Sequence, residues 1–484
     1  MKAYDKLIFE LSKPGRIGFS LADDEFTTAD YEKYFDKDTM RGTELDFPEI
    51  NETELVRHYT ALSNLNFGVD TGFYPLGSCT MKYNPKINEE IANKSEFSRL
   101  HPDQCEEDVQ GTLALMSDAS KALAEITGMD DISLQPAAGS HGELTGLMII
   151  KAYHLKNNQG HRVNIIVSDS AHGTNPASAN MAGFNAVEIK SDAMGGIDLQ
   201  KLRDSIDENF AGLMLTNPST LGLFEENIVE ITKIVHEAGG LLYYDGANMN
   251  AIMSKVRPGD MGFDIIHLNL HKTFSTPHGG GGPGAGPIGV KKHLTKFLPY
   301  PVLTEKNNQY HLSYDRPDSI GKIKNYYGNV GIIIRAYTYI LEMGRDGLKK
   351  ASEMAVLNAN YMQSRLKDYY KLPIDVYCKH EFVLSGNFGL THGINTLDIA
   401  KRLIDFGFHP PTIYFPLIID QAMMIEPTET ESIESMNQFI DAMIQIRQEI
   451  DERSDLLHTA PNHTHISRID EVAAARNPIT TYVK

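Results

Sequence analysis

Tryptophan is absent from this chain of 484 residues, and cysteine occurs only at Cys79, Cys105 and Cys378. The three cysteines lie far apart, their number is odd, and no two of them form a Cys-x-x-Cys pair. This distribution argues against a disulfide framework and against a cysteine-rich metal site, and it is typical of a reducing compartment. We therefore expect a cytoplasmic protein.

Long apolar runs and an excess of basic residues are missing as well. No apolar run approaches the roughly 18 residues that a membrane span needs. The N-terminus mixes Lys2, Asp5 and Glu10 with one short apolar run, unlike a signal peptide. Lys and Arg number 45 against 64 Asp and Glu, a formal net charge of −19. We therefore expect neither a membrane nor a nucleic acid as a partner.

The composition is sufficient for a large folded core. Apolar residues make up 41% and charged residues 23%, as in globular proteins, and the length suggests two or three domains. Residues 1–90 are polar and rich in turns, which predicts an N-terminal arm with one helix over 52–63. We expect a large domain over 91–330, a smaller C-terminal domain over 331–455 and a surface tail over 456–484.

Short apolar runs alternate with helical patterns through the middle of the chain. This alternation predicts βαβ units and therefore an α/β fold, with a mainly parallel sheet covered by helices. In such sheets the ligand lies beyond the carboxyl ends of the strands. A long helix over 330–367 then leads to the smaller α/β domain, with strands predicted at 381–384 and 422–425. In the large domain the predicted strands are 132–134, 163–167, 212–215, 241–244 and 265–268, and the predicted helices include 107–126, 142–153 and 226–238.

Lys272 follows the last of these predicted strands and comes directly after His271. This position puts an amine at the ligand-binding edge of the sheet, where partial burial favours the uncharged, nucleophilic form that attacks an aldehyde. A single loop lysine is more commonly a solvated side chain. The residues at the ends of the neighbouring strands decide between the two interpretations.

Asp245 and His172 each follow another predicted strand. An acid in the position of Asp245 can hold the protonated nitrogen of a pyridine ring, although Asp-Gly is also a common turn. His172 can stack on a cofactor ring or assist proton transfer, and it also suits a loop before a helix capped by Thr174 or Asn175. Together with Lys272, these two residues predict a pyridoxal 5′-phosphate site.

Gly139, Ser140 and His141 join a predicted strand to a helix. Backbone N–H groups at such a helix start, together with the Ser140 hydroxyl, can bind a phosphate group. By itself this signal is weak, because any tight strand–helix turn uses glycine and serine.

Two other motifs suggest sites that we do not predict. The glycine-rich run at 279–286 lacks the Gly-Lys-Ser/Thr of a nucleotide-binding loop and a following helix, so we interpret it as a flexible flap beside Lys272. His458, His463 and His465 have no carboxylate or cysteine at ligand spacing, so we expect a polar tail and no metal.

The order of the motifs resembles that of the P-protein of the glycine cleavage system. More narrowly, it resembles the chain that forms the C-terminal half of that enzyme where the P-protein is split into two subunits. The segments that carry the resemblance include Ala-Gly-Ser-His at 138–141, His-Gly-Thr-Asn-Pro at 172–176, Asp-Gly-Ala-Asn at 245–248, Asn-Leu-His-Lys-Thr-Phe at 269–274, and the stretches 68–85, 407–412 and 426–429. They span nearly the whole chain.

The resemblance implies the fold-type-I architecture of pyridoxal-phosphate enzymes, which is that of aspartate aminotransferase. The family's cofactor-carrying lysine falls on Lys272, its ring-stacking histidine on His172 and its pyridinium aspartate on Asp245. Ala247 is expected to contact the cofactor beside Asp245, and the phosphate contacts fall on residues 139–141.

The resemblance also implies a reaction and partners. The family decarboxylates glycine and transfers the remaining aminomethyl group to the oxidised lipoyl arm of the H-protein. It works with P-protein subunit 1, in a heterotetramer of two copies of each subunit. We expect His271 or His172 to relay protons. The tail, at 480–482, departs from the family because it lacks a tryptophan, which leaves the predicted catalytic positions unaffected.

Two alternatives differ from this interpretation. Another fold-type-I enzyme, such as an aminotransferase or a cysteine desulfurase, would share the same lysine and aspartate. An aminotransferase needs an arginine for a second carboxylate, and Arg257 and Arg335 are the candidates. A non-catalytic partner of an active subunit would have little reason to keep Lys272, Asp245 and His172 together.

Overall fold

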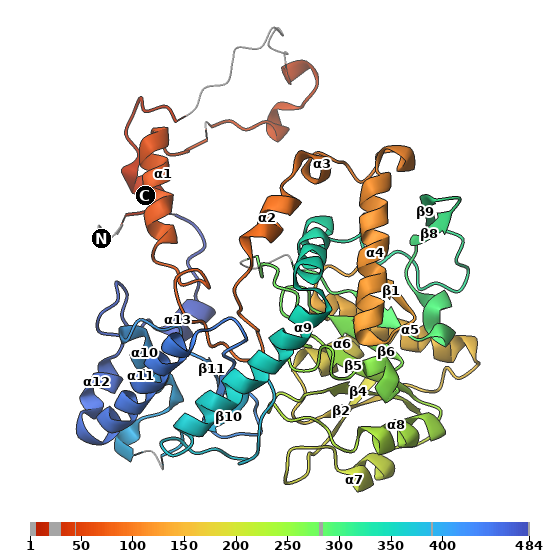
Figure 1. Ribbon diagram of the computed structural model, residues 1–484. Helices are drawn as coiled ribbons and strands as arrows, with labels where there is room; N and C mark the ends of the chain where they lie inside the picture. The colour runs from red at the N-terminus through yellow and green to blue at the C-terminus, as the bar shows by residue number, and fades with distance from the viewer. Residues whose placement is uncertain (1–5, 19–30, 44, 280–283, 389–390, 483–484) are drawn as a thin grey trace. The chain divides into compact units, whose positions relative to one another are not determined.

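The structure is a computed structural model that describes residues 6–18, 31–43, 45–279, 284–388 and 391–482 (Figure 1). The chain divides into two compact units, Met1–Gly72 and Phe73–Lys484. Within the described ranges, no helix has both the length and the apolar character that a membrane crossing requires. The domain boundaries predicted at 330 and 455 fall inside the second unit and stay predictions.

Among its described residues, the first unit contains one α-helix, α1 (Glu52–Ser63), with the bounds predicted from the sequence. The helix begins after Asn51, whose side-chain oxygen accepts a hydrogen bond from the backbone N–H of Glu54 at 2.9 Å. The acidic residues Glu52 and Glu54 also favour a helix N-terminus. Three 3-10 helices accompany α1: η1 (Ile8–Leu11), η2 (Tyr31–Lys33) and η3 (Lys37–Thr39).

A seven-stranded sheet forms the centre of the second unit. Its strands are β1 (Asp131–Ser133), β2 (Asn164–Ser168), β3 (Asn185–Ile189), β4 (Phe210–Thr216), β5 (Leu241–Gly246), β6 (Ile265–Leu268) and β7 (Ile288–Val290). Their order is β1-β7-β6-β5-β4-β2-β3. The five strands from β6 to β3 are parallel, and only β7 runs against its two neighbours. The predicted mainly parallel sheet is therefore confirmed.

Successive residues of the buried strands pack into two different hydrophobic cores. Ile166 and Leu242 face one core, whereas their neighbours Ile165 and Tyr243 face the other. Helices cover both faces of the sheet (Figure 1), which explains why the strands read as continuous apolar runs. Helices α4 (Gln110–Thr127), α8 (Ile228–Glu237) and the start of α9 (Val330–Leu366) supply the first core, and α5 (Gly139–Lys156) and α6 (Thr174–Met181) supply the second.

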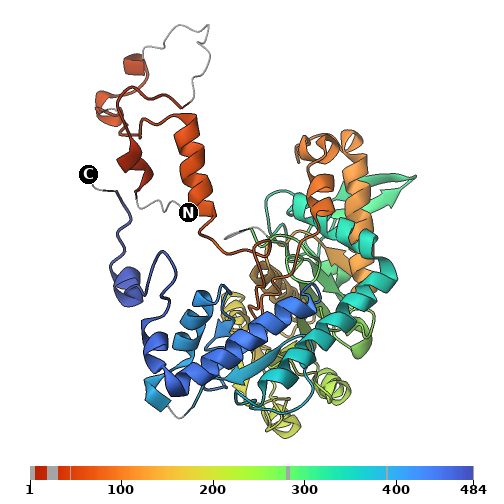
Figure 2. The ribbon, with the colours of Figure 1, turned by 60° about the vertical axis from the view of Figure 1, so that its left-hand side comes forward.

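A second, antiparallel sheet has its own core. Its order is β10 (Phe382–Ser385), β12 (Ala422–Ile425), β11 (Thr412–Ile413). Helix α9 extends from the first core into this one, with a break at Gly344, where φ is 57°. Helices α10 (Thr396–Asp405), α11 (Ile433–Glu452) and α12 (Ser454–Thr459) complete the layer, and α11 lies beside α9 (Figure 2).

The remaining elements, like β3, β7, β11 and the helices α10 to α12 above, were not predicted from the sequence. Strands β8 (Val302–Lys306) and β9 (Gln309–Ser313) form a hairpin whose turn is Asn307-Asn308. Both asparagines have positive φ, which two-residue hairpin turns require and which asparagine tolerates, so this pair is the feature of the sequence that could have predicted the hairpin. The predicted glycine-rich flap lies largely on residues 280–283, outside the described residues. The other short elements are α2 (Lys86–Ala92), α3 (Ser95–Ser98), η4 (Glu106–Asp108), α7 (Leu199–Asp204), η5 (Pro258–Met261), η6 (Lys292–Phe297), η7 (Thr391–Gly393) and α13 (Glu471–Arg476).

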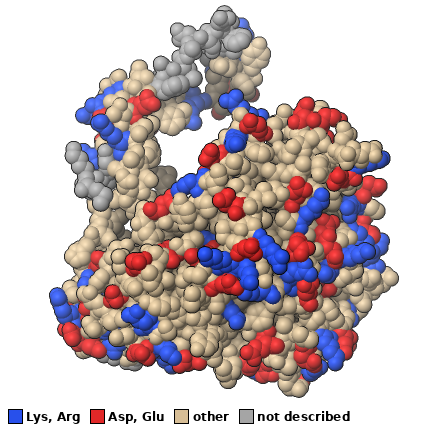
Figure 3. All heavy atoms as spheres, in the orientation of Figure 1, with Lys and Arg blue, Asp and Glu red and all other residues tan. Residues whose placement is uncertain are grey.

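Acidic and basic side chains are interspersed on the face drawn in Figure 3. The net negative charge of the chain is therefore not gathered in one patch on this face, and it gives no preference there for a polycationic or a polyanionic partner.

Candidate functional site

A cavity of about 340 Å³ lies at the carboxyl ends of the parallel strands. Seven of the eight predicted site residues line it, and His141 does not. Residues from the second sheet and from the segment before α2 complete the wall. The predicted residues in the lining are Gly139, Ser140, His172, Asp245, Ala247, His271 and Lys272, and the lining residues used below are Ser78, Glu143, Thr216, Asn248, Asn269, His380 and Glu381.

Lys272 lies in the turn after β6, where its backbone N–H donates to the carbonyl of Asn269 at 3.0 Å. The side chain is half-buried. The two nearby imidazoles are uncharged at neutral pH: burial first, and then neighbouring positive groups, lower the pKa of His271 to about 3 and that of His278 to about 4. Lys272 therefore lines the cavity beside two uncharged imidazoles, those of His271 and His278.

Asp245 ends β5 and is 3% exposed. Asn175 donates to its Oδ2 at 2.9 Å, and the backbone N–H of Ala247 donates to its Oδ1 at 3.1 Å. His267 Nε2 lies 3.4 Å from the same Oδ1. Burial raises the pKa of Asp245, but His267 and the two hydrogen bonds outweigh burial and hold it below the ordinary value. The structure thus keeps a buried carboxylate charged at the edge of the cavity.

His172 is oriented by residues of two helices. Its Nδ1 lies 2.8 Å from the hydroxyl of Thr174, and that hydroxyl donates to the buried carboxylate of Glu143 at 2.8 Å. The imidazole also packs edge-on against Phe415, with ring centroids 5.6 Å apart. These contacts hold the ring of His172, which is exposed, in the lining of the cavity.

The start of α5 forms another part of the wall. The helix begins at Gly139 with no side-chain cap, so the N–H groups of its first turn are available to an anion. A Cβ on Gly139 would lie 2.3 Å from Oδ1 of Asn269, so only glycine leaves room here. His141 is used differently, because its Nδ1 accepts a hydrogen bond from the N–H of Ala137 at 3.1 Å. It therefore shapes the turn from outside the cavity.

Several buried polar atoms of the wall lack a hydrogen-bond partner among the described residues: Thr216 Oγ1, Asn269 Oδ1 and His271 Nδ1. Unpaired buried groups are costly unless a ligand or water satisfies them. With a helix N-terminus, a buried carboxylate and an amine, they suit a ligand that carries a phosphate, a basic ring and an aldehyde, which is the chemistry of pyridoxal phosphate.

The cavity wall includes no arginine among the described residues. Arg257 pairs with Glu125 and Asp260, and Arg335 pairs with Glu89. Both arginines are therefore committed elsewhere, and neither holds a second substrate carboxylate as an aminotransferase would require.

Comparison with known proteins agrees with this site. Residues 29–308 match the family model described as "Glycine cleavage system P-protein", and residues 351–464 match "Glycine dehydrogenase, C-terminal domain". The chain is 61% identical over 484 residues to the "Probable glycine dehydrogenase (decarboxylating) subunit 2" of Caldanaerobacter subterraneus, covering 100% of both chains. It is 60% identical over 478 residues to the protein of the same name from Listeria innocua, covering 99% of this chain and 98% of that one.

Solved structures show the same fold. A glycine decarboxylase (P-protein) in inhibitor-bound form aligns with a TM-score of 0.71 at 18% identity, over 86% of this chain and 94% of that one. A glutamate decarboxylase from Lactobacillus brevis aligns with a TM-score of 0.67 at 15% identity, over 88% and 97%. The predicted fold-type-I architecture is confirmed. The chain belongs to the P-protein family of the glycine cleavage system.

Proposed function

We propose that this chain binds pyridoxal phosphate on Lys272 and decarboxylates glycine, passing the aminomethyl group to the lipoyl arm of the H-protein. The observation that carries the proposal is that Lys272 and the charged, buried Asp245 line one cavity at the carboxyl ends of neighbouring strands. The partners are P-protein subunit 1, two copies of each chain forming a heterotetramer, and the H-protein. The three free cysteines favour the cytoplasm.

The residues of the site divide the work of binding. Lys272 would hold the cofactor covalently. Asp245 would hold the ring nitrogen, His172 would lie against the ring with Ala247 nearby, and the N–H groups at Gly139 and Ser140 would hold the phosphate. When bound, pyridoxal phosphate supplies an aldehyde that takes up the amine of glycine and a ring that accepts the electron pair left behind by CO₂.

The same residues also set the protonation states. Asp245 keeps its negative charge because three groups stabilise it, and this charge favours a protonated ring nitrogen. His271 is uncharged at neutral pH, and its Nδ1 has no hydrogen-bond partner among the described residues. A base with a pKa of about 3 takes up a proton only weakly at neutral pH, so both His271 and the exposed His172 stay candidates for the proton relay.

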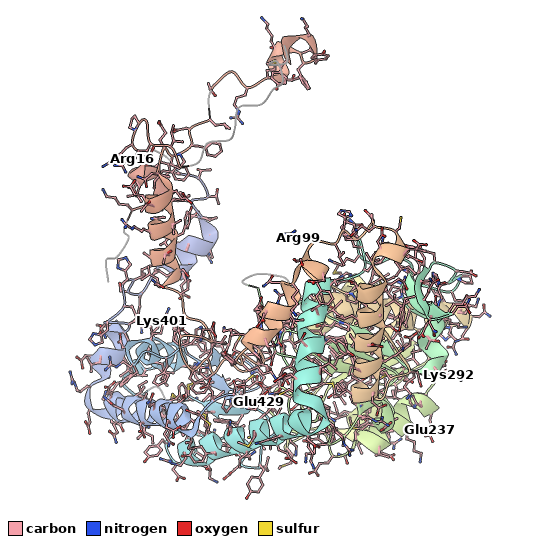
Figure 4. The ribbon with its side chains drawn as sticks, turned by 45° about the horizontal axis from the view of Figure 1, so that its top comes forward. Arg16, Arg99, Glu237, Lys292, Lys401 and Glu429 are labelled. Atoms are coloured by element: carbon pink, nitrogen blue, oxygen red, sulfur yellow. The ribbon has the colours of Figure 1, made fainter. Side chains whose placement is uncertain are left out.

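Borohydride reduction tests the attachment to Lys272. We expect the purified chain, mixed with pyridoxal phosphate and subunit 1, to develop an absorbance band that borohydride abolishes while fixing the cofactor on the peptide containing Lys272. K272A should give neither the band nor the labelled peptide. K292A removes a lysine from the surface (Figure 4) and serves as the control that keeps both. A label on any other lysine, or none with subunit 1 present, contradicts the proposal.

Gly139→Ala is expected to weaken cofactor binding. The added methyl group would lie 2.3 Å from Oδ1 of the buried Asn269, which must then move into the cavity. Overpacking of this kind costs about 1–3 kcal/mol, which corresponds to roughly 10- to 100-fold weaker binding of pyridoxal phosphate. Titration of the cofactor absorbance measures the change.

Gly111→Ala is the matched control for this substitution. Gly111 also lies in the first turn of a helix, α4, but a Cβ there would meet nothing within 4 Å. Its cofactor affinity should equal that of the parent chain. Equal affinities for both variants would mean that the start of α5 does not hold the phosphate.

A further inference from the structure

Two buried carboxyl groups lie together beside Lys272. Glu381 directly precedes β10 and is 3% exposed, and Glu426 directly follows β12 and is 0% exposed. One oxygen of each lies within 4.8 Å of the other and of a nitrogen of His380. Among the described residues, neither carboxyl forms an ion pair with lysine or arginine; the one partner recorded is His380, whose Nε2 is 3.5 Å from Oε1 of Glu381. Two charges at this distance repel strongly in a buried site.

The hydrogen bonds to the two carboxyl groups are unequal. Glu426 accepts from the backbone N–H of Thr80 at 3.0 Å, from its hydroxyl at 2.7 Å and from the amide of Asn248 at 3.0 Å. Within the described part of the chain, Glu381 accepts a single hydrogen bond, from the backbone N–H of Ser78 at 2.7 Å. Donors stabilise a carboxylate in its charged form. The negative charge is therefore favoured on Glu426, and the proton is favoured on Glu381.

The pKa values have the same order. Burial, and then the charge of Glu426, raise the pKa of Glu381 well above its ordinary value. Burial raises the pKa of Glu426 to about 7, against the opposing effect of Thr80 and Asn248. At neutral pH the pair thus holds a proton, and Glu381 is the carboxyl that keeps it.

A metal ion bound between them would also explain why two buried carboxyl groups lie so close together, but the hydrogen-bond donors to these carboxyl groups argue against a metal ion. The N–H groups of Ser78 and Thr80 each donate to one oxygen of the pair, so they occupy positions that a cation would need. The positive charge of Lys272 acts on both carboxyl groups as well. A proton needs one lone pair and fits the arrangement better.

Glu381 and its neighbour His380 line the cavity, whereas Glu426 is fully buried and is not part of the lining. His380 is 2% exposed and its Nδ1 has no partner among the described residues. Burial and Lys272 lower the pKa of His380 to about 3, so its ring is uncharged. The wall that faces Lys272 therefore presents uncharged hydrogen-bonding groups and, in the described lining, no arginine.

We propose that Glu381, in its protonated form, is the hydrogen-bond donor that binds the carboxylate of glycine in this cavity. The inference rests on the proposed function, which brings a carboxylate to this site. An O–H donor makes a short, strong bond to a carboxylate. Unlike an arginine, it leaves no fixed positive charge to stabilise the carboxylate against loss of CO₂, so less ground-state binding opposes the reaction.

This arrangement makes glycine binding depend on pH. Once Glu381 loses its proton it repels the substrate carboxylate, so the KM for glycine should rise roughly tenfold per pH unit above the pKa of Glu381. The other charged or titratable groups around Glu381 are Lys272, Glu426, Cys79, His380, Cys378 and Lys379. Of these, Glu426 titrates at about 7, and burial raises the pKa of Cys79 and brings that of Cys378 to about 12.

Glu381→Gln separates the proton from the shape of the side chain. The glutamine keeps an N–H donor in the same place but has no titratable group. We expect the KM for glycine of E381Q to be flat over the pH range in which that of the parent chain rises, while kcat changes less. A parallel rise in both proteins would overturn the proposal, because the titrating group would then be another residue.

Infrared spectroscopy of the protein labelled with ¹³C-glutamate measures whether Glu381 is protonated, and it requires no substrate and no turnover. At about pH 8 to 9, where Glu426 with its pKa of about 7 is charged, the parent chain should show a buried carboxylic-acid band. E381Q should lack this band, and the control E353Q should keep it, since Glu353 is exposed and paired with Lys255. E426Q removes the repelling charge, so the band should titrate at lower pH. Retention of the band in E381Q would overturn the proposal.

The two proposals fail differently. A parent chain that turns over no glycine with subunit 1 and H-protein contradicts the proposed function, whereas the infrared band still reports on Glu381. If E381Q does not fold, E426Q can be used for the kinetic test instead, because its KM for glycine should begin to rise at a lower pH than that of the parent chain. If the KM of E426Q rises at the same pH as that of the parent chain, the charge of Glu426 does not hold the proton on Glu381, and the proposal is contradicted.

Discussion

Replacing Asp245 with asparagine is expected to slow glycine decarboxylation by about a thousandfold. The substitution removes one negative charge and keeps the size of the side chain. A carboxylate that faces a cation at about 4 Å in a partly buried site contributes roughly 4 kcal/mol, and each 1.36 kcal/mol corresponds to about tenfold in rate. The charge matters most after CO₂ has left, so the effect should fall on kcat. The measurement is glycine–CO₂ exchange with subunit 1, H-protein and saturating pyridoxal phosphate.

Asp264→Asn is the control for the loss of a buried aspartate from the same sheet. Asp264 is 5% exposed and accepts hydrogen bonds from His236 at 2.9 Å and from the N–H of Leu242 at 2.8 Å. It precedes β6, whereas Asp245 ends β5, so the two lie toward opposite edges of the parallel sheet. D264N should keep its exchange rate. If D245N also keeps it, Asp245 does not hold the ring nitrogen.

The residues at the ends of the strands could be predicted from the sequence, because the apolar runs predict where each strand lies and where it ends. Lys272 and His172 follow buried strands and Asp245 is the last residue but one of β5, and the rule that parallel strands end at one edge predicts that such residues lie close together. All three line one cavity. Their roles toward the cofactor stay proposals.

Residues that reach the site through tertiary packing could not be predicted in this way. The sequence predicts for Glu381 only that it begins a strand in the smaller domain. Nothing in its local sequence indicates that this strand, β10, lies close to the end of the other sheet. Glu143 looked like an ordinary helix residue. Ser78 and Thr80 belong to a turn-rich segment, residues 74–82, for which the sequence allows either a place at the mouth of the site or a role in an interface. The hydrogen bonds that decide the proton on Glu381 come from such residues, so only the folded structure identifies them.

Lys82→Met is expected to destabilise the second unit by about 3–5 kcal/mol, the cost of leaving one partner of a buried ion pair alone. The side chain of Lys82 is 1% exposed, and its Nζ donates to Glu429 at 2.7 Å and to Asn250 at 3.2 Å. Figure 4 shows Glu429 beside α9, whose Tyr339 accepts from the same Nζ at 3.3 Å. Methionine fills the space of the stem but leaves Glu429 charged and unpaired. Urea-induced unfolding measures the loss.

The size of this effect depends on burial, and the chain offers a comparison. Lys255 and Glu353 also form an ion pair, but their side chains are 43% and 46% exposed, so Lys255→Met should cost less than about 1 kcal/mol. The double variant Lys82→Met/Glu429→Gln removes the unpaired charge and should recover most of the stability lost by Lys82→Met. If Lys82→Met and Lys255→Met lower the free energy of unfolding equally, the side chain of Glu429 becomes exposed to solvent when Lys82 is replaced. In that case the segment around Thr80, which holds Glu426, is anchored by its own hydrogen bonds and not by this ion pair.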